Sequence, residues 1–129
     1  MNYFNQAHGR MGESVAAAYL ERKGFYIIEQ NAEFHDKETG KKIAEVDIIA
    51  SKNKGAEIHF VEVKYRKTTD YGTGAMAVGK AKQKNVKNGA MRWLMLSKLY
   101  DSVIVSFDVV EVSGDAPDFE INHYENCFY

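Results

Sequence analysis

The ten residues from Glu57 to Arg66, EIHFVEVKYR, constrain this 129-residue chain more than any other stretch. Their alternating side chains predict a β-strand, in which residues two apart share one face. Glu62 and Lys64 then lie next to each other in the middle of one face. The simplest explanation is a strand face that solvent covers. The alternative is that a rigid strand holds a carboxylate and an ammonium group together for chemistry.

A second strand is expected at KIAEVDIIA, residues 42–50, and it carries Asp47 where a core strand is normally apolar. Burying an unpaired carboxylate is costly, so Asp47 needs a cation, a hydrogen-bond network or a cleft. A hairpin across residues 51–55 with an even loop, centred at 53–54 or 54–55, puts Asp47 and Glu62 on one face. Their Cβ atoms would be about 5 Å apart if directly opposed, or about 7–8 Å apart if diagonal. Both carboxylates could then reach one divalent cation, whereas a three-residue loop would separate them.

The first helix is expected at HGRMGESVAAAYLERKGF, residues 8–25, with Gly24 ending it. Glu13 shares the small, apolar side of this helix with Ala16, Ala17 and Leu20. An acid there is either a charge that the helix dipole favours or a residue of a cleft. Taken alone, the position favours the dipole explanation.

The remaining pattern predicts an α/β fold in one domain, residues 1–129. Strands are expected at 25–34, 57–66 and 101–112, with a further one within 119–129, and a second helix at 78–96. In that helix Trp93, Leu94 and Leu96 are expected to face the core. The order of helix, three strands, helix and one or two strands indicates a sheet with helices packed on it.

Composition excludes several classes of protein. One cysteine, Cys127, cannot build a disulfide framework or a zinc site, so we expect a reducing, cytoplasmic setting and a small buried hydrophobic role for its side chain. No apolar run approaches the roughly 20 residues of a membrane span, and the polar N-terminal stretch is no signal peptide. The four histidines are scattered, and His59 is expected on the strand face opposite Glu62, so none is assigned as a ligand.

Charge is strongly segregated although the net charge is only −1. Residues 64–98 hold nine Lys or Arg against one acid, and residues 99–129 hold seven acids and no Lys or Arg. A basic block of this kind indicates contact with a polyanion on one side. A solvated basic helix face explains the charge equally well.

The ordered series of Glu13, Asp47, Glu62 and Lys64 resembles the nuclease motif written PD-(D/E)xK. The resemblance is closer to the YraN-type family of uncharacterised bacterial proteins, which is similar to the Holliday-junction resolvases. It covers nearly the whole chain from Gly9, and it is carried by GESVAAAYLERKGFYIIEQN, AEVDIIA, FVEVKYRKTTDYGTGAMAV, Lys82-Gln83, FDVVEV and INHYENCFY. The chain departs from the pattern at Ala44, where the family usually has Gly, and at Val46, where the wider motif has Pro. Neither change removes a ligand.

The resemblance implies a restriction-endonuclease-like core, a mixed central sheet flanked by helices, and a metal-dependent endonuclease acting on DNA. The implied catalytic residues are Glu13, Asp47, Glu62 and Lys64. Mg²⁺ or Mn²⁺ would be held by Asp47, Glu62 and the carbonyl of Val63, with Glu13 binding directly or through water. Lys64 would orient or deprotonate the attacking water, or stabilise the phosphate oxygens.

The substrate implied by the same resemblance is branched, flap or single-stranded DNA, and a homodimer is suggested. The residues expected to bind nucleic acid are Arg66, Lys67, Tyr71, Lys80, Lys82, Gln83, Lys84 and Lys87. Lys82 is expected nearest the phosphates, and Tyr71 either stacks on a base or anchors its own loop.

Three other functions are weighed against a nuclease. GAMAVGKA, residues 74–81, resembles a phosphate-binding loop but ends in Ala81 where Ser or Thr is needed for Mg²⁺. A module on the same fold could clamp nucleic acid without cutting it, although a pure binder does not need three acids that face a phosphate. An interaction domain could pair these acids with neighbouring lysines.

Overall fold

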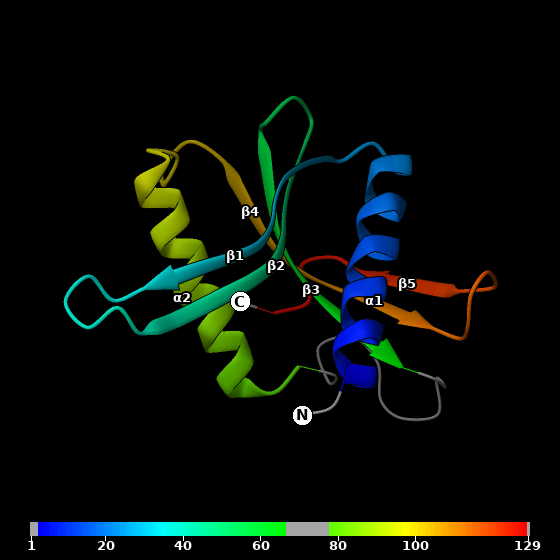
Figure 1. The fold of residues 1–129 in the computed structure, drawn as a ribbon. Coiled ribbons are helices and arrows are strands. Elements are labelled where there is room, and N and C mark those ends of the chain that lie inside the picture. Colours follow the sequence, from blue (N-terminus) through cyan, green and yellow to red (C-terminus); the bar gives the residue numbers. More distant parts are fainter. Residues whose placement is uncertain (1–2, 67–77, 129) are drawn as a thin grey trace.

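The computed structural model describes residues 3–66 and 78–128, with side chains from residue 11 onward. The described residues form two helices and five strands, which are arranged as in Figure 1. In chain order they are α1 (Tyr3–Arg22), β1 (Tyr26–His35), β2 (Lys42–Lys52), β3 (Glu57–Arg66), α2 (Lys80–Leu96), β4 (Ile104–Ser113) and β5 (Glu120–Tyr124). The predicted order of elements is therefore confirmed. None of the described helices combines the length and the apolar character that crossing a membrane requires.

The five strands form one mixed sheet in the order β1-β2-β3-β4-β5. All neighbouring strands are antiparallel except β3 and β4, which run parallel. A parallel pair needs a crossover connection, and α2 lies in the chain between these two strands. The mixed sheet with helices confirms the predicted α/β class and is consistent with a restriction-endonuclease-like core.

One helix packs against each face of the sheet (Figure 1). Helix α1 ends as predicted: Gly24 has a φ of +94°, and the Phe25 N–H donates to the Leu20 carbonyl at 3.0 Å. Its buried face joins Leu20 and Phe25 to Val61 of β3 and Val110 of β4. The α2 face forms a second cluster that includes Phe60, Val86, Ala90, Leu94 and Val109.

The β1–β2 pair runs past α2 as a long arm (Figure 1). Ala44 and Val46 pack in the α2 cluster, whereas Ile48 and Ala50 pack in the α1 cluster. Alternation along β2 predicts one shared face for these four residues, but they lie on two, because the arm turns from one layer to the other at Asp47. Twist of this kind is inherent to β-sheets, and the period of a single strand does not reveal it.

Two details of α2 differ from the sequence-based expectation. Leu96 is 75% exposed, so it does not belong to the core face with Leu94; Trp93 is half-buried and makes an edge-to-face contact with Phe60. Gly89, a weak helix former, is buried where the helix meets β1 and β2, and a Cβ there would lie 3.1 Å from Phe34 and Val46. Close packing therefore accounts for a glycine at this position.

Candidate active site

The β2–β3 hairpin brings Asp47 and Glu62 opposite each other. Its pairing runs from Lys52–Glu57 to Ile48–Val61, which leaves a loop of four residues, 53–56. The loop is even and centred at 54–55, so the predicted register is confirmed. Asp47 and Glu62 are the next residue on each strand, directly beyond the last backbone pair, where the two strands begin to separate.

Beyond this last pair, the Val63 N–H of β3 has no backbone carbonyl of β2 as its partner, and the Asp47 carboxylate accepts its hydrogen bond instead. Its Oδ2 atom accepts a hydrogen bond from the Val63 N–H at 2.8 Å, and the side chain is buried. Asp47 is therefore held against β3 by a bond that orients its second oxygen. The Val63 carbonyl as a metal ligand stays a prediction.

The Glu62 carboxyl group is buried with a free oxygen atom. Its residue is 3% exposed, and Oε2 is the one buried side-chain polar atom of the described residues without a hydrogen-bond partner. Two ammonium groups approach the other oxygen: Nζ of Lys82 lies 3.8 Å and Nζ of Lys64 4.0 Å from Oε1. Lys64 comes from β3 and Lys82 from α2, so two different elements supply positive charge to this carboxyl group.

Burial and the neighbouring carboxylate change the acidity of Glu62. Burial, reinforced by the charge of Asp47, raises the pKa of Glu62 to about 8 in spite of Lys82 and Lys64. Burial also raises the pKa of Asp47, but the Val63 N–H and the charge of Lys82 oppose this. In the protein without metal, burial thus makes the Glu62 carboxyl group retain its proton near neutral pH.

Glu13 of α1 approaches the same region and is half-buried. Burial and then the charge of Asp47 raise the pKa of Glu13, whereas the Asn31 amide, which faces it as a hydrogen-bond donor, lowers it. The sequence did not indicate Asn31 as a residue of the site. It has a φ of +53° in the middle of β1, between residues that pair with Val46 and Ile48, and so lies opposite Asp47. The tolerance of Asn for the left-handed region is the signal that could have found it.

The predicted nucleic-acid-binding lysines of α2 are divided between two faces of the helix. On α2, Lys80, Lys84 and Lys87 recur at spacings of four and three and share a helix face, whereas Lys82 lies on a different face beside Glu62. The Gln83 side chain donates to the Val78 carbonyl at 2.9 Å and braces the start of the helix. Two further predicted residues, Lys67 and Tyr71, lie outside the described residues, and Arg66 forms an ion pair with Glu111 at 3.6 Å.

The donor atoms fit a hard divalent cation. Asp47 and Glu62 offer carboxylate oxygens, which are the ligands that Mg²⁺ and Mn²⁺ prefer, and the unpartnered Oε2 of Glu62 is available to one. The three acids Glu13, Asp47 and Glu62 do not bring one oxygen each within 4.8 Å of one another. Whether Glu13 binds an ion directly or through water therefore stays a prediction.

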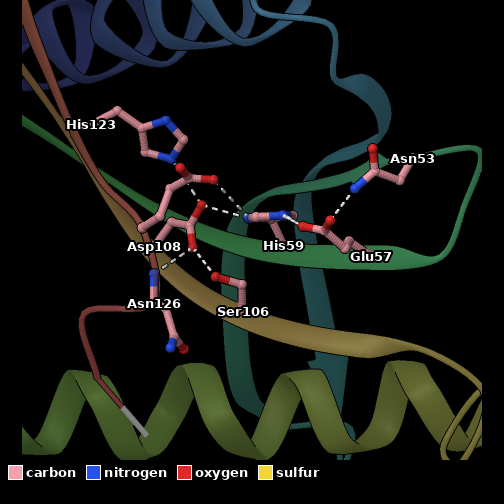
Figure 2. A network of polar contacts seen from close by, with 8 residues as sticks. Asn53, Glu57, His59, Ser106, Asp108, His123 and Asn126 are labelled. Atoms are coloured by element: carbon pink, nitrogen blue, oxygen red, sulfur yellow. Dashed lines mark hydrogen bonds and ion pairs between the residues drawn. The ribbon is translucent and has the colours of Figure 1, made fainter.

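A second polar cluster, which we call the histidine cluster, consists of His59, Asp108, His123 and Glu125. His59 Nδ1 lies 2.7 Å and His123 Nε2 2.8 Å from Asp108 Oδ2, and Figure 2 shows both rings pointing at this carboxylate. Glu125 Oε1 lies 4.0 Å from His59 Nδ1. The expectation that the histidines are scattered is wrong for these two, because pairing of β3, β4 and β5 joins positions far apart in the chain.

Comparison with known proteins identifies the family. The model of a family described as "Uncharacterised protein family UPF0102" matches residues 12–112. The chain belongs to UPF0102. This UPF0102 chain is 37% identical over 125 residues to a UPF0102 protein of Trichlorobacter lovleyi, covering 96% of the chain and 91% of that relative. It is also 37% identical over 128 residues to a UPF0102 protein of Geobacter sulfurreducens, and the match covers 98% of the chain and 92% of that relative.

A third UPF0102 protein, from Syntrophus aciditrophicus, is 41% identical over 109 residues, which cover 84% of the chain and 78% of that relative. The predicted YraN-like membership is therefore confirmed. UPF0102 is uncharacterised, so membership assigns no activity to Asp47 and Glu62. The matched residues 12–112 include these two acids and Lys82 but end before His123 and Glu125.

Proposed function

We propose that this UPF0102 chain is a metal-dependent endonuclease that hydrolyses phosphodiester bonds of DNA. The observation that carries the proposal is the unpartnered, buried Oε2 of Glu62, which lies beyond the last β2–β3 pair together with Asp47. A buried carboxyl oxygen without a donor destabilises a fold, so a bound cation gives a reason for its presence.

Each side chain of the site has a role in this reaction. Asp47 and Glu62 would hold Mg²⁺ or Mn²⁺, and Glu13 would bind the ion directly or through water. Such an ion lowers the pKa of a bound water and neutralises charge on the scissile phosphate. Binding requires Glu62 to lose its proton, and the ammonium groups of Lys64 and Lys82 near Oε1 favour that loss.

Lys64 and Lys82 would also contact the scissile phosphate, because both ammonium groups lie within 4.0 Å of Glu62 Oε1. Lys64 is half-buried on β3, which fixes its position better than a loop would. It would orient the attacking water or stabilise the growing negative charge on the phosphate oxygens. Lys82 approaches from α2 and would hold the phosphate against the two acids.

The experiment compares cleavage of labelled single-stranded, duplex, flap, splayed and four-way DNA with Mg²⁺, Mn²⁺ or EDTA. Asp47→Ala and Lys64→Ala should abolish metal-dependent cutting and leave binding intact. Lys37→Ala, which changes an exposed lysine in the β1–β2 loop, is the matched control and should cut like the unmodified protein. The resemblance to junction resolvases favours branched DNA, and a homodimer would suit symmetric cutting.

The opposite results would identify another function. Binding of DNA without cutting in either metal would contradict a nuclease and support a clamp on the same fold. Cutting that survives Asp47→Ala would place the active site elsewhere. If the isolated chain neither binds nor cuts any of the five DNAs, that result would contradict the proposal for the isolated chain.

A further inference from the structure

The histidine cluster lies apart from Asp47 and Glu62. His59 precedes Glu62 by three residues on β3, so the two side chains leave the strand on opposite faces. The cluster belongs to the side of the sheet that α1 covers: the Phe25 ring packs edge-on against His59 with centroids 4.8 Å apart, and it lies 5.8 Å from the His123 ring. It therefore takes no part in the site proposed above.

Its donor atoms converge from three parts of the chain. Asp108 of β4 is completely buried, and its Oδ2 atom is shared by the two imidazoles at 2.7 and 2.8 Å. Ligand atoms of His59, Asp108 and Glu125 all lie within 4.8 Å of one another. The Glu125 side chain is 52% exposed, so the fourth donor comes from the solvent side.

On His59 and Asp108, the atoms that face away from this point are already bound. His59 Nε2 lies 3.0 Å from Glu57 Oε1, and the other oxygen of Glu57 accepts from the Asn53 amide (Figure 2). Asp108 Oδ1 accepts from the Ser106 hydroxyl at 2.6 Å and from the Asn126 N–H at 3.1 Å. A histidine that binds a metal usually donates its second ring nitrogen to a carboxylate in this manner.

The chemistry of the four donors selects the class of ion. Two imidazole nitrogens and two carboxylate oxygens suit Zn²⁺ and similar first-row ions, whereas Mg²⁺ and Ca²⁺ prefer oxygen alone. Donor atoms around a tetrahedral Zn²⁺ are about 3.3 Å apart, given bonds of about 2.0–2.1 Å. The two imidazoles would each move about half an ångström away from Asp108, Glu125 would turn inward, and His123, which lies outside the group of three, would turn toward His59 and Glu125.

We propose that the histidine cluster binds a divalent transition-metal ion of the Zn²⁺ class. The ion takes the place of the hydrogen atoms that now lie between the imidazole nitrogens and Asp108, these protons leave to solvent, and the positive charge of the ion offsets the two carboxylates. Because Glu125 follows β5 and Asn126 also contacts Asp108, the bound ion fastens the segment after β5 to the middle of the sheet.

The test uses the full chain carrying Asp47→Asn and Glu62→Gln, which removes the carboxylates of the proposed nuclease site. Co²⁺ titration followed by visible absorption should show one ion per chain with the bands of a four-coordinate site. Zn²⁺ should displace it, and elemental analysis after dialysis should find one Zn²⁺ per chain together with a higher Tm.

Two further variants should keep the fold; one changes a proposed ligand of the ion and the other changes the partner of a ligating histidine. Glu125→Gln should weaken Zn²⁺ binding at least tenfold without changing the Tm of the metal-free protein, because its side chain is half exposed. Glu57→Gln should weaken binding by about 10- to 100-fold, as is typical for a partner of a ligating histidine. Glu120→Gln, an exposed acid of β5, is the matched control and should bind Zn²⁺ like its parent.

Either of two results would overturn the proposal. One is no Co²⁺ or Zn²⁺ retained by the parent chain, and the other is equal affinity in the Glu125→Gln, Glu57→Gln and control variants. The cluster would then be a hydrogen-bonded tie between strands. Since the nuclease carboxylates are absent from every protein tested, neither result bears on DNA cleavage.

Discussion

Glu62 is a buried carboxyl group whose Oε2 atom accepts no hydrogen bond within the described part of the chain. Its pKa of about 8 links the site to folding stability. The unfolded chain loses this proton near the ordinary value of 4.5, whereas the folded chain retains it until about pH 8. Without metal, the contribution of Glu62 to stability is therefore greatest below pH 4.5 and declines as the pH rises to about 8.

Glu62→Gln should consequently stabilise the metal-free protein at high pH. In EDTA at pH 8 we expect a Tm about 5 °C above that of the unmodified protein, and the difference should vanish as the pH falls to 4.5. Scanning calorimetry at several pH values measures both. Glu38→Gln, at an exposed acid of the β1–β2 loop, should show no such trend. A variant no more stable than the unmodified protein at pH 8 would contradict the burial argument.

Addition of Mg²⁺ should make the unmodified protein more stable than Glu62→Gln. The ion binds only the folded protein, so it should raise the Tm of the unmodified chain with increasing concentration. Glu62→Gln lacks one charged ligand and should respond weakly, and Asp47→Asn should respond in the same way. A Tm that Mg²⁺ leaves unchanged in the unmodified chain, at concentrations up to tens of millimolar, would count against a metal site at these residues.

Asn31 holds a left-handed backbone conformation opposite Asp47, with a φ of +53°. Ala is strained in this region by about 1–2 kcal/mol, and Gly is not. Asn31→Ala should therefore be less stable than Asn31→Gly by about 1 kcal/mol in urea unfolding, although Ala is the better residue in most other conformations. Equal stability of the two variants would show that the backbone relaxes here.

At the scale of elements, the contact between α2 and the β1–β2 arm depends on Gly89. An alanine would improve the helix by about 1 kcal/mol, but its Cβ would lie 3.1 Å from Phe34 and Val46. Both neighbours are buried, and overpacking of this kind costs about 1–3 kcal/mol, so the steric effect should win. We expect Gly89→Ala to destabilise the protein by about 1 kcal/mol in urea unfolding.

The neighbouring exposed residue provides a control for that prediction. Asn88→Ala lies in the same turn of α2 and points to solvent, so it should stabilise the helix by a few tenths of a kcal/mol. If Gly89→Ala is stabilising as well, the arm moves away from α2 at little cost. In that case the Glu45 N–H bond to the Asn85 side chain would not hold the arm in place.

At the scale of the whole molecule, the segregated charges predict how DNA binding depends on salt. Replacing Lys80, Lys84 and Lys87 together with Gln should weaken binding to every DNA shape and reduce the slope of log K against log salt by about 2–3. Lys82→Gln should abolish cutting and change that slope by no more than about 1. Fluorescence anisotropy at several salt concentrations measures the slopes, and equal slopes for both variants would contradict a division of roles between the two faces of α2.

Much of the fold followed from local patterns. The period of two in residues 57–66 predicted β3 with the bounds that the structure has, and Gly24 predicted the end of α1. Other elements shifted by a few residues at their ends, as caps and turns compete there with the pattern. Leu96 was placed wrongly, because α2 ends at this residue and leaves the surface of the sheet.

The candidate site divides in the same way. The sequence by itself determined that the placement of Asp47 and Glu62 depends on one hairpin loop, because the alternation of two strands is a local property, and the structure has the even loop that puts them opposite each other. Only the tertiary structure decided that Lys82 reaches Glu62, that Asn31 lies opposite Asp47, and that His59 and His123 meet at Asp108. These contacts join elements that are distant in the chain, and the twist of the sheet and the α2 crossover, which no local period encodes, determine which of them approach.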